Sequence, residues 1–280
     1  MNFNFIRVVT LLCGSLASVA GALAADVDVT RLPAVSAPNG KVEVSGGWVG
    51  MNGQPSSVDL RGGASISFPV NDIFGIQADI AAANAFSDTK YGGALHLFTR
   101  DPNAYLLGAA GGAFWSSNAN AQFVGPEAEA YIGNVSLEAF AGYMNLNVAG
   151  VSSAKFFGFG DVAYYPAENL RLNFGVSDVA DFKSAHAQVE YQFSDTQPIS
   201  LTLAGKVGDN SFVGVDAGLK IYFGASSKSL IRRHREDDPR NRMLDVFGGA
   251  GNGLIPPPAT TLPPPPCIPV QANNFCGTGG

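Results

Sequence analysis

Most charged residues between positions 41 and 224 fall on one side of segments in which apolar and polar residues alternate. In 184–193, for example, Glu190 shares a face with His186, whereas Ala185 and Val189 lie on the other face. Successive side chains of a β-strand point to opposite faces of the sheet, so these charges project to one side. The set predicted to share this face is Glu43, Asp59, Arg61, Asp79, Glu127, Glu129, Glu138, Asp161, Arg171, Glu190, Lys206, Asp216 and Lys220.

Candidate catalytic and ligand-binding residues are sparse. His96 and His186 fall on the charged face, but neither has a serine and a polar partner in a recognisable arrangement, so hydrogen bonds to neighbouring carboxylates are the simpler interpretation. Cys267 and Cys276 are separated by eight residues, a spacing that matches no common metal site and leaves either a disulfide or two free thiols. The sequence therefore predicts neither an enzyme nor a cofactor.

The elements that must position the charged face are short alternating segments separated by Gly, Pro, Asn and Asp. Twelve can be counted, with ten or fourteen as alternatives: 41–51, 58–70, 74–85, 90–100, 104–115, 122–132, 135–146, 155–165, 170–179, 184–193, 199–207 and 213–224. The connections between these segments are short at both ends of the predicted strands. The pattern predicts an all-β, up-and-down antiparallel sheet.

Several observations favour a sheet that is closed in a membrane. Only 14% of residues are charged, and no apolar run beyond the first 25 residues is long enough to span a bilayer as a helix. Aromatic residues gather beside one set of turns, as expected at a membrane interface. Charged side chains facing lipid cost up to about 2–4 kcal/mol each, so their face should line a lumen, and unpaired strand edges in lipid require closure.

The amino terminus has the form of a secretory signal. Arg7 precedes an apolar core, and 22–24 (Ala-Leu-Ala) gives a cleavage site after residue 24, with cleavage after residue 25 as an alternative. Residues 25–40 lack periodicity and are expected to form a periplasmic leader, and residues 41–224 the barrel. The 23 acidic residues exceed the basic ones, which argues against a nucleic-acid partner.

The character of the chain changes after residue 224. Residues 225–280 are first rich in Arg and Lys and then rich in Pro and Gly, a composition that does not bury a core by itself. The sequence predicts a disordered periplasmic tail with one helical turn near 231–235, in which His234 adds to a solvated cluster of charge. Both termini are expected to be periplasmic.

The segment 213–224 (VGVDAGLKIYFG) resembles the closing strand of bacterial outer-membrane β-barrel proteins, since Gly218, Leu219, Ile221 and Phe223 form an alternating strand with a terminal aromatic. The resemblance implies a porin-like transmembrane barrel in the outer membrane, in contact with lipid and lipopolysaccharide and inserted by the barrel assembly machinery. It implies a narrow passive channel for small hydrophilic solutes, and the acidic excess of the lumen favours cationic or neutral ones.

The alternative function is structural. A mature chain that begins Ala25-Asp26 is similar to outer-membrane barrels that are joined to peptidoglycan through their terminal amine, so a barrel without conductance that tethers the envelope to peptidoglycan is also predicted. These two hypotheses differ in whether the lumen conducts.

Overall fold

The computed structural model describes residues 32–117, 119–224, 227–237 and 239–253. Within these residues, twelve antiparallel strands form one closed barrel, which confirms the predicted fold and strand number. The strands are β1 (Asn39–Met51), β2 (Gln54–Pro69), β3 (Phe74–Ala85), β4 (Asp88–Asp101), β5 (Tyr105–Trp115), β6 (Ala119–Ile132), β7 (Val135–Val148), β8 (Val151–Ala167), β9 (Leu170–Val179), β10 (Phe182–Ser194), β11 (Gln197–Gly208) and β12 (Phe212–Phe223).

Each strand pairs with its neighbours in sequence, and the ring closes where β1 pairs with β12 from Gly40–Phe223 to Gly50–Val213. Hairpins therefore build the whole wall. Apolar side chains such as Leu95 and Val124 are exposed on the outer surface, while polar residues on the alternate positions are buried inside. This is the alternation expected of a barrel that meets lipid outside and polar groups inside.

The two ends of the barrel have different turns. At one end, four of the β-turns place non-glycine residues at positive φ, as at Phe86 (52°) and Ser87 (61°), and again at Ala180 (53°) and Asp181 (70°). Two successive residues with positive φ suit the twist of a tight hairpin. All the connections between strands in the described residues are short, as predicted.

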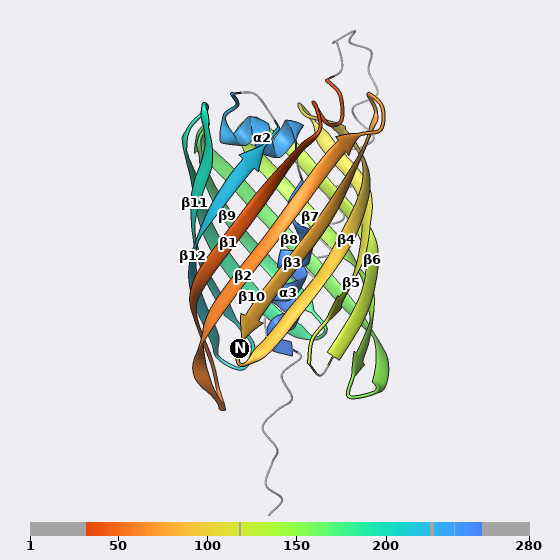
Figure 1. Ribbon diagram of the computed structural model, residues 1–280, viewed down its shortest axis with the longest axis vertical. Helices are drawn as coiled ribbons and strands as arrows, with labels where there is room; N and C mark the ends of the chain where they lie inside the picture. The colour runs from red at the N-terminus through yellow and green to blue at the C-terminus, as the bar shows by residue number, and fades with distance from the viewer. Residues whose placement is uncertain (1–31, 118, 225–226, 238, 254–280) are drawn as a thin grey trace, which may run out of the picture.

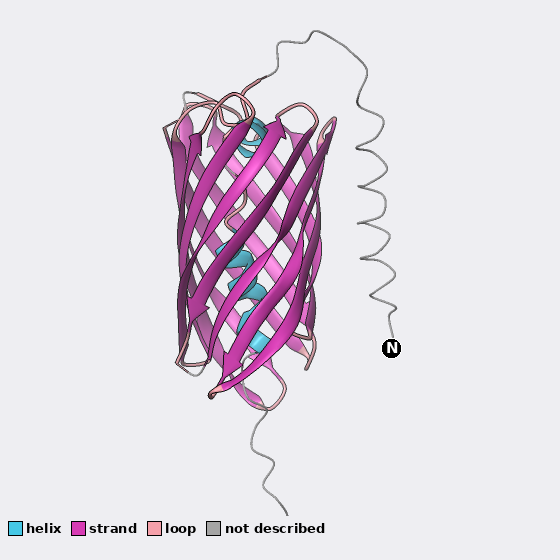
Figure 2. Cartoon of the chain, turned by 90° about the vertical axis from the view of Figure 1, so that its right-hand side faces the viewer, coloured by secondary structure: helices cyan, strands magenta, loops and turns pink. Residues whose placement is uncertain are grey.

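The segment after β12 corrects the prediction of a disordered tail for residues 227–253, whereas residues 254–280 lie outside the described residues. Residues 227–253, called the plug below, contain helix α2 (Leu230–Glu236) and helix α3 (Arg242–Gly253). Helix α2 lies across one end of the barrel, and α3 lies inside it (Figures 1 and 2). The predicted helical turn near 231–235 thus belongs to α2, and neither helix is long and apolar enough to cross a membrane.

The first and last described residues lie at different places in the barrel. Ala34 bonds to Asp72 at the β2–β3 turn, on the end that α2 covers (the α2 end). A Cβ at Gly249 of α3 would meet Val179 beside the β9–β10 turn, at the opposite end (the α3 end). The described chain thus starts and finishes at opposite ends of the barrel. The termini themselves lie outside the described residues, so their periplasmic location stays a prediction.

The leader is packed rather than free where it is described. Ala34 and Val35 are fully buried, and Val35 packs with Phe98, Leu106 and Tyr131 inside the α2 end. The predicted signal (1–24), Ala25, Asp26, Cys267 and Cys276 lie outside the described residues.

Candidate functional site

The lumen holds all thirteen residues that the alternation placed on the charged face. Eight are buried against the plug or against each other: Asp59, Asp79, Glu127, Glu129, Glu138, Asp161, Arg171 and Glu190. The other five line a cavity that remains beside the plug: Glu43, Arg61, Lys206, Asp216 and Lys220. Whether these residues border a conducting path stays a prediction.

Helix α2 closes its end of the barrel through long basic side chains. Arg235 donates to the Gly133 carbonyl (2.9 Å) and lies 4.9 Å from the centre of the Tyr131 ring. Arg100 of β4 donates to the carbonyls of Ala34 (2.6 Å) and Asp237 (2.9 Å), which ties the leader and the plug to the wall. Among the basic residues that suggested a solvated tail, Arg235 and Arg233 are therefore bound to the rim, whereas Arg232 is exposed.

His234 of α2 is largely enclosed against the wall rather than solvated, which corrects the sequence interpretation. Its Nδ1 lies 2.9 Å from the Tyr165 hydroxyl, and its Nε2 lies 3.1 Å from the Tyr222 hydroxyl. Tyr222 donates its own proton to Glu190 (2.6 Å), so it accepts from an N–H on Nε2, and Tyr165 donates to Nδ1. Burial lowers the pKa of His234 to about 3, against the opposing attraction of Glu190. The ring is neutral, so the 3.8 Å approach of Glu190 is not an ion pair.

Arg240 crosses the middle of the lumen between two wall carboxylates. Its Nη1 lies 2.8 Å from Asp161 and 3.3 Å from Glu138, and its Nη2 lies 2.7 Å from Asp245 of α3. Burial alone would raise the pKa of Asp245, but Arg240 and Arg242 outweigh it and hold that pKa below its usual value. Arg171 completes the cluster with a 2.7 Å bond to Glu138.

Arg242 begins α3 at a second group of carboxylates. Its backbone N–H donates to Asp79 (2.9 Å), and its guanidinium carbon lies 5.4 Å from the centre of the Phe140 ring. His96 joins Asp79 (2.9 Å) to Glu127 (3.0 Å), and on the other side of the lumen His186 bonds to Asp161 (2.8 Å). The predicted pairing of the lumen histidines with carboxylates is confirmed.

The lumen also contains an aromatic surface that was not predicted from the sequence. Phe114, Phe123, Phe140 and Phe157 pack into one cluster with Met243, Val246 and Phe247 of α3. The Phe247 ring lies edge-on to Phe114 at 5.7 Å. The alternation in the sequence does indicate this surface. Phe123 is an even number of residues from Glu127, and Phe140 is an even number from Glu138, so each phenylalanine shares a face with a lumen carboxylate.

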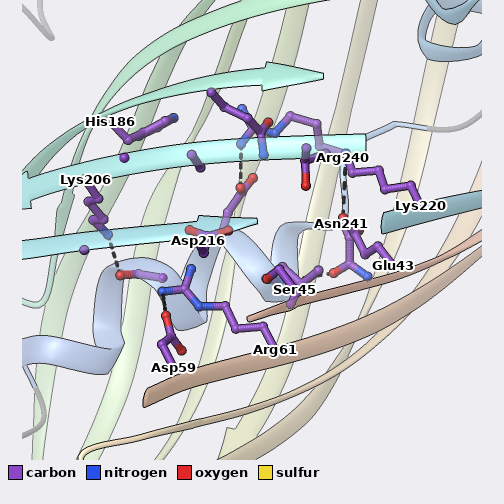
Figure 3. A pocket seen from close by; sticks show the side chains of 18 of the residues that line it. Glu43, Ser45, Asp59, Arg61, His186, Lys206, Asp216, Lys220, Arg240 and Asn241 are labelled. Atoms are coloured by element: carbon purple, nitrogen blue, oxygen red, sulfur yellow. Dashed lines mark hydrogen bonds and ion pairs between the residues drawn. The ribbon is translucent and has the colours of Figure 1, made fainter. Parts of the chain in front are cut away.

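The remaining space is a cavity of about 170 Å³ between the plug and strands β1, β2 and β10–β12. Figure 3 shows Arg61 paired with Asp59 and Lys206 directed at the plug backbone, where it donates to the Gly248 carbonyl. Glu43 and Lys220 lie near its α2 side, 3.7 Å apart. Such a cavity is polar and large enough for several water molecules.

Comparison with known proteins identifies the fold. No family model matches the chain, and no curated protein matches its sequence. Among solved structures, a KdgM porin in complex with disordered oligogalacturonate is 7% identical, with a TM-score of 0.51, over 66% of this chain and 99% of its own. The COG4313 outer membrane channel from Pseudomonas putida F1 is 9% identical, with a TM-score of 0.48, over 71% of this chain and 100% of its own.

The structural neighbours are outer-membrane β-barrels, and they include porins and channels. At such low identity the likeness concerns the fold alone. It agrees with the closed β-barrel implied by the closing strand.

Proposed function

We propose that this protein is an outer-membrane β-barrel that acts as a narrow passive channel for small hydrophilic solutes, along the cavity beside the plug. The observation that carries the proposal is a closed wall with an apolar exterior around a charged cavity of about 170 Å³. Its similarity to a porin supports the same function. A twelve-stranded barrel lies between those filled by side chains and those that enclose a wide aqueous channel, and here the plug takes most of the space.

The solute preference follows from the charges of the wall. Among the thirteen residues predicted for the lumen, nine are acidic and four are basic, and three further basic residues of the wall, Lys41, Lys90 and Arg100, are buried inside. Arg240 and Arg242 of the plug neutralise part of this excess at Glu138, Asp161 and Glu127. We therefore expect cationic or neutral solutes to be preferred, and the cation preference to grow when the plug is displaced.

Planar-bilayer conductance tests the proposal. The full chain should give small, discrete, cation-preferring steps. The double variant Arg240→Ala, Arg242→Ala should give severalfold larger steps, because each lost arginine leaves buried carboxylates unpaired at about 3–5 kcal/mol, enough to undock α3. Arg232→Ala is the matched control, because Arg232 is 56% exposed and pairs only with Glu236 of its own helix among the ion pairs of the described residues.

The structural alternative is favoured by the extent to which the plug fills the lumen. If the full chain and the double variant are both silent in bilayers, the channel proposal is wrong and a barrel that tethers the envelope to peptidoglycan is the better account. Attachment through Ala25-Asp26 remains part of that proposal. Mass spectrometry of muramidase-released barrel tests it, and an unmodified amino-terminal peptide would argue against attachment.

A further inference from the structure

The guanidinium of Arg242 lies beside Glu127, Glu129 and the ring of Phe140, and Asp79 accepts the backbone N–H of the same residue; these four wall residues are called the cation subsite. Arg242 is fully buried there, and Phe140 supplies an aromatic face at 5.4 Å. Carboxylates beside an aromatic face are a common arrangement for holding an organic cation.

Arg242 fits this pocket poorly. Its Nε lies 3.5 Å from Glu127 and its Nη2 lies 4.0 Å from Glu129, and neither nitrogen has a hydrogen-bond partner among the described residues. Good charge-assisted bonds are about 2.7–2.9 Å long. Among the residues that the structure describes, the one side-chain carboxylate within normal reach of the guanidinium is that of Asp245, at 3.1 Å, which belongs to the plug itself. Arg242 therefore does not use all the hydrogen-bond acceptors that Glu127 and Glu129 offer.

The wall of the cation subsite is held in place independently of the plug. His96 bonds to Asp79 through Nε2 and to Glu127 through Nδ1, and all three side chains are buried. Without Arg242, the three carboxylates of the cation subsite would share one histidine and two neutral donors, the Tyr131 hydroxyl at Glu129 and the Gln77 amide at Asp79. Buried charges without partners are costly, so the vacant pocket requires a cation.

An aromatic subsite adjoins the cation subsite. Phe140 also packs against Phe123 (6.3 Å between ring centres) and Phe157 (4.8 Å), and Phe114 continues this surface to Phe247 of α3. Aromatic rings in a barrel lumen are apolar surface that needs a partner, because the interior of such barrels is otherwise polar. In this structure, α3 supplies that partner.

We propose that the two subsites form one binding site for a small organic cation that carries an aromatic group, and that α3 occupies this site as an internal competitor. Arg242 stands in for the cationic group of the ligand, and Phe247 stands in for its ring. The inference deepens the proposed channel function, on which it rests for the route by which a solute reaches the lumen.

Benzamidine, which joins a phenyl ring to an amidinium, is the probe. Isothermal titration of the refolded full chain in micelles should show that Arg242→Ala binds benzamidine about tenfold more tightly than the unmodified chain, because the competitor no longer fills the cation subsite. Guanidinium chloride and benzyl alcohol, which each match one subsite, should bind at least about tenfold more weakly than benzamidine. Adding Glu127→Gln to Arg242→Ala should abolish the gain.

Arg232→Ala should leave the benzamidine affinity unchanged, since its side chain lies on the exposed face of α2. Equal affinity in the unmodified chain and Arg242→Ala, or a gain that survives Glu127→Gln, overturns the proposal. If Arg242→Ala does not refold, Phe247→Ala tests the other subsite, and it must tighten benzamidine binding for the proposal to stand. If benzamidine binds but the bilayer shows no conductance, the channel proposal is wrong and the binding site stands. If the protein conducts but benzamidine does not bind, the binding-site proposal is wrong and the channel stands.

Discussion

His234 shows how a single enclosed ring can set the stability of the α2 end. The ring is neutral, and it is surrounded by hydroxyl and charged groups from several strands: Lys41, Tyr165, Arg171, Glu190, Lys220 and Tyr222. Burial places its pKa near 3, well below the ordinary value of 6.5. Between these two values the unfolded segment binds a proton that the docked ring does not. Docking of α2 is therefore weakened as the pH falls through 6.5, and the loss continues to about pH 3.

At the residue scale, we predict that α2 loses about 1–2 kcal/mol of docking free energy between pH 7.5 and pH 5. Hydrogen exchange of the 230–236 amides, corrected for intrinsic rates, measures this loss as faster exchange at pH 5. His234→Gln keeps a donor and an acceptor without a titrating ring, so its exchange should not change over this interval. Equal pH dependence in both proteins would assign the effect to other groups.

At the scale of the element, strands β6 and β7 approach unusually closely near Gly142. A Cβ at this position would lie 2.1 Å from the Val124 carbonyl oxygen and 2.7 Å from the Gly125 Cα. The regular pairing of the two strands is interrupted beside Pro126, which has no N–H to donate. Because Gly125 and Gly142 have no side chains, the backbones of β6 and β7 stay close together across this interruption.

We predict that Gly142→Ala destabilises the barrel by about 1–3 kcal/mol, because the added methyl group meets backbone that cannot move without shifting a strand. Urea unfolding of the refolded protein, followed by tryptophan fluorescence, measures the change. Gly160→Ala in β8 is the matched control, since nothing lies within 4 Å of a Cβ there, and its effect should stay within about 0.5 kcal/mol. Equal losses in both variants would contradict this explanation.

At the scale of the whole molecule, the plug gives the barrel a direction. The chain passes from the α2 end, where Lys41 of β1 donates to the Pro239 carbonyl (2.7 Å), to the α3 end, where α3 approaches Val179. If the α2 end is periplasmic, as expected from the resemblance of the closing strand, the α3 end faces the exterior of the cell.

We predict that a thiol at the α3 end is labelled in intact cells by a membrane-impermeant maleimide. Ser211→Cys, in the β11–β12 turn, should react, whereas Asn134→Cys, in the β6–β7 turn of the α2 end, should react only after lysis. Both variants carry Ser in place of Cys267 and Cys276, so that only the introduced thiol is measured. The reversed labelling pattern would place the α2 end outside.

The sequence by itself determined the wall. Period-two alternation fixes which side chains share a face, and hairpin connections pair each strand with the next, so twelve strands and the inward set from Glu43 to Lys220 follow from local pattern. Only the last pairing, between β1 and β12, joins distant parts of the chain. The chemistry of bilayer and water is enough to explain this part of the fold.

Only the tertiary structure decided what fills the lumen. The plug has the composition of a segment that cannot form a core alone, and its contacts span long sequence distances, as between Arg242 and Asp79, 163 residues apart. It folds because the wall supplies carboxylates for its arginines and phenylalanines for its apolar residues. That complementarity exists only once the barrel has closed, which is why a one-dimensional pattern predicted a free tail.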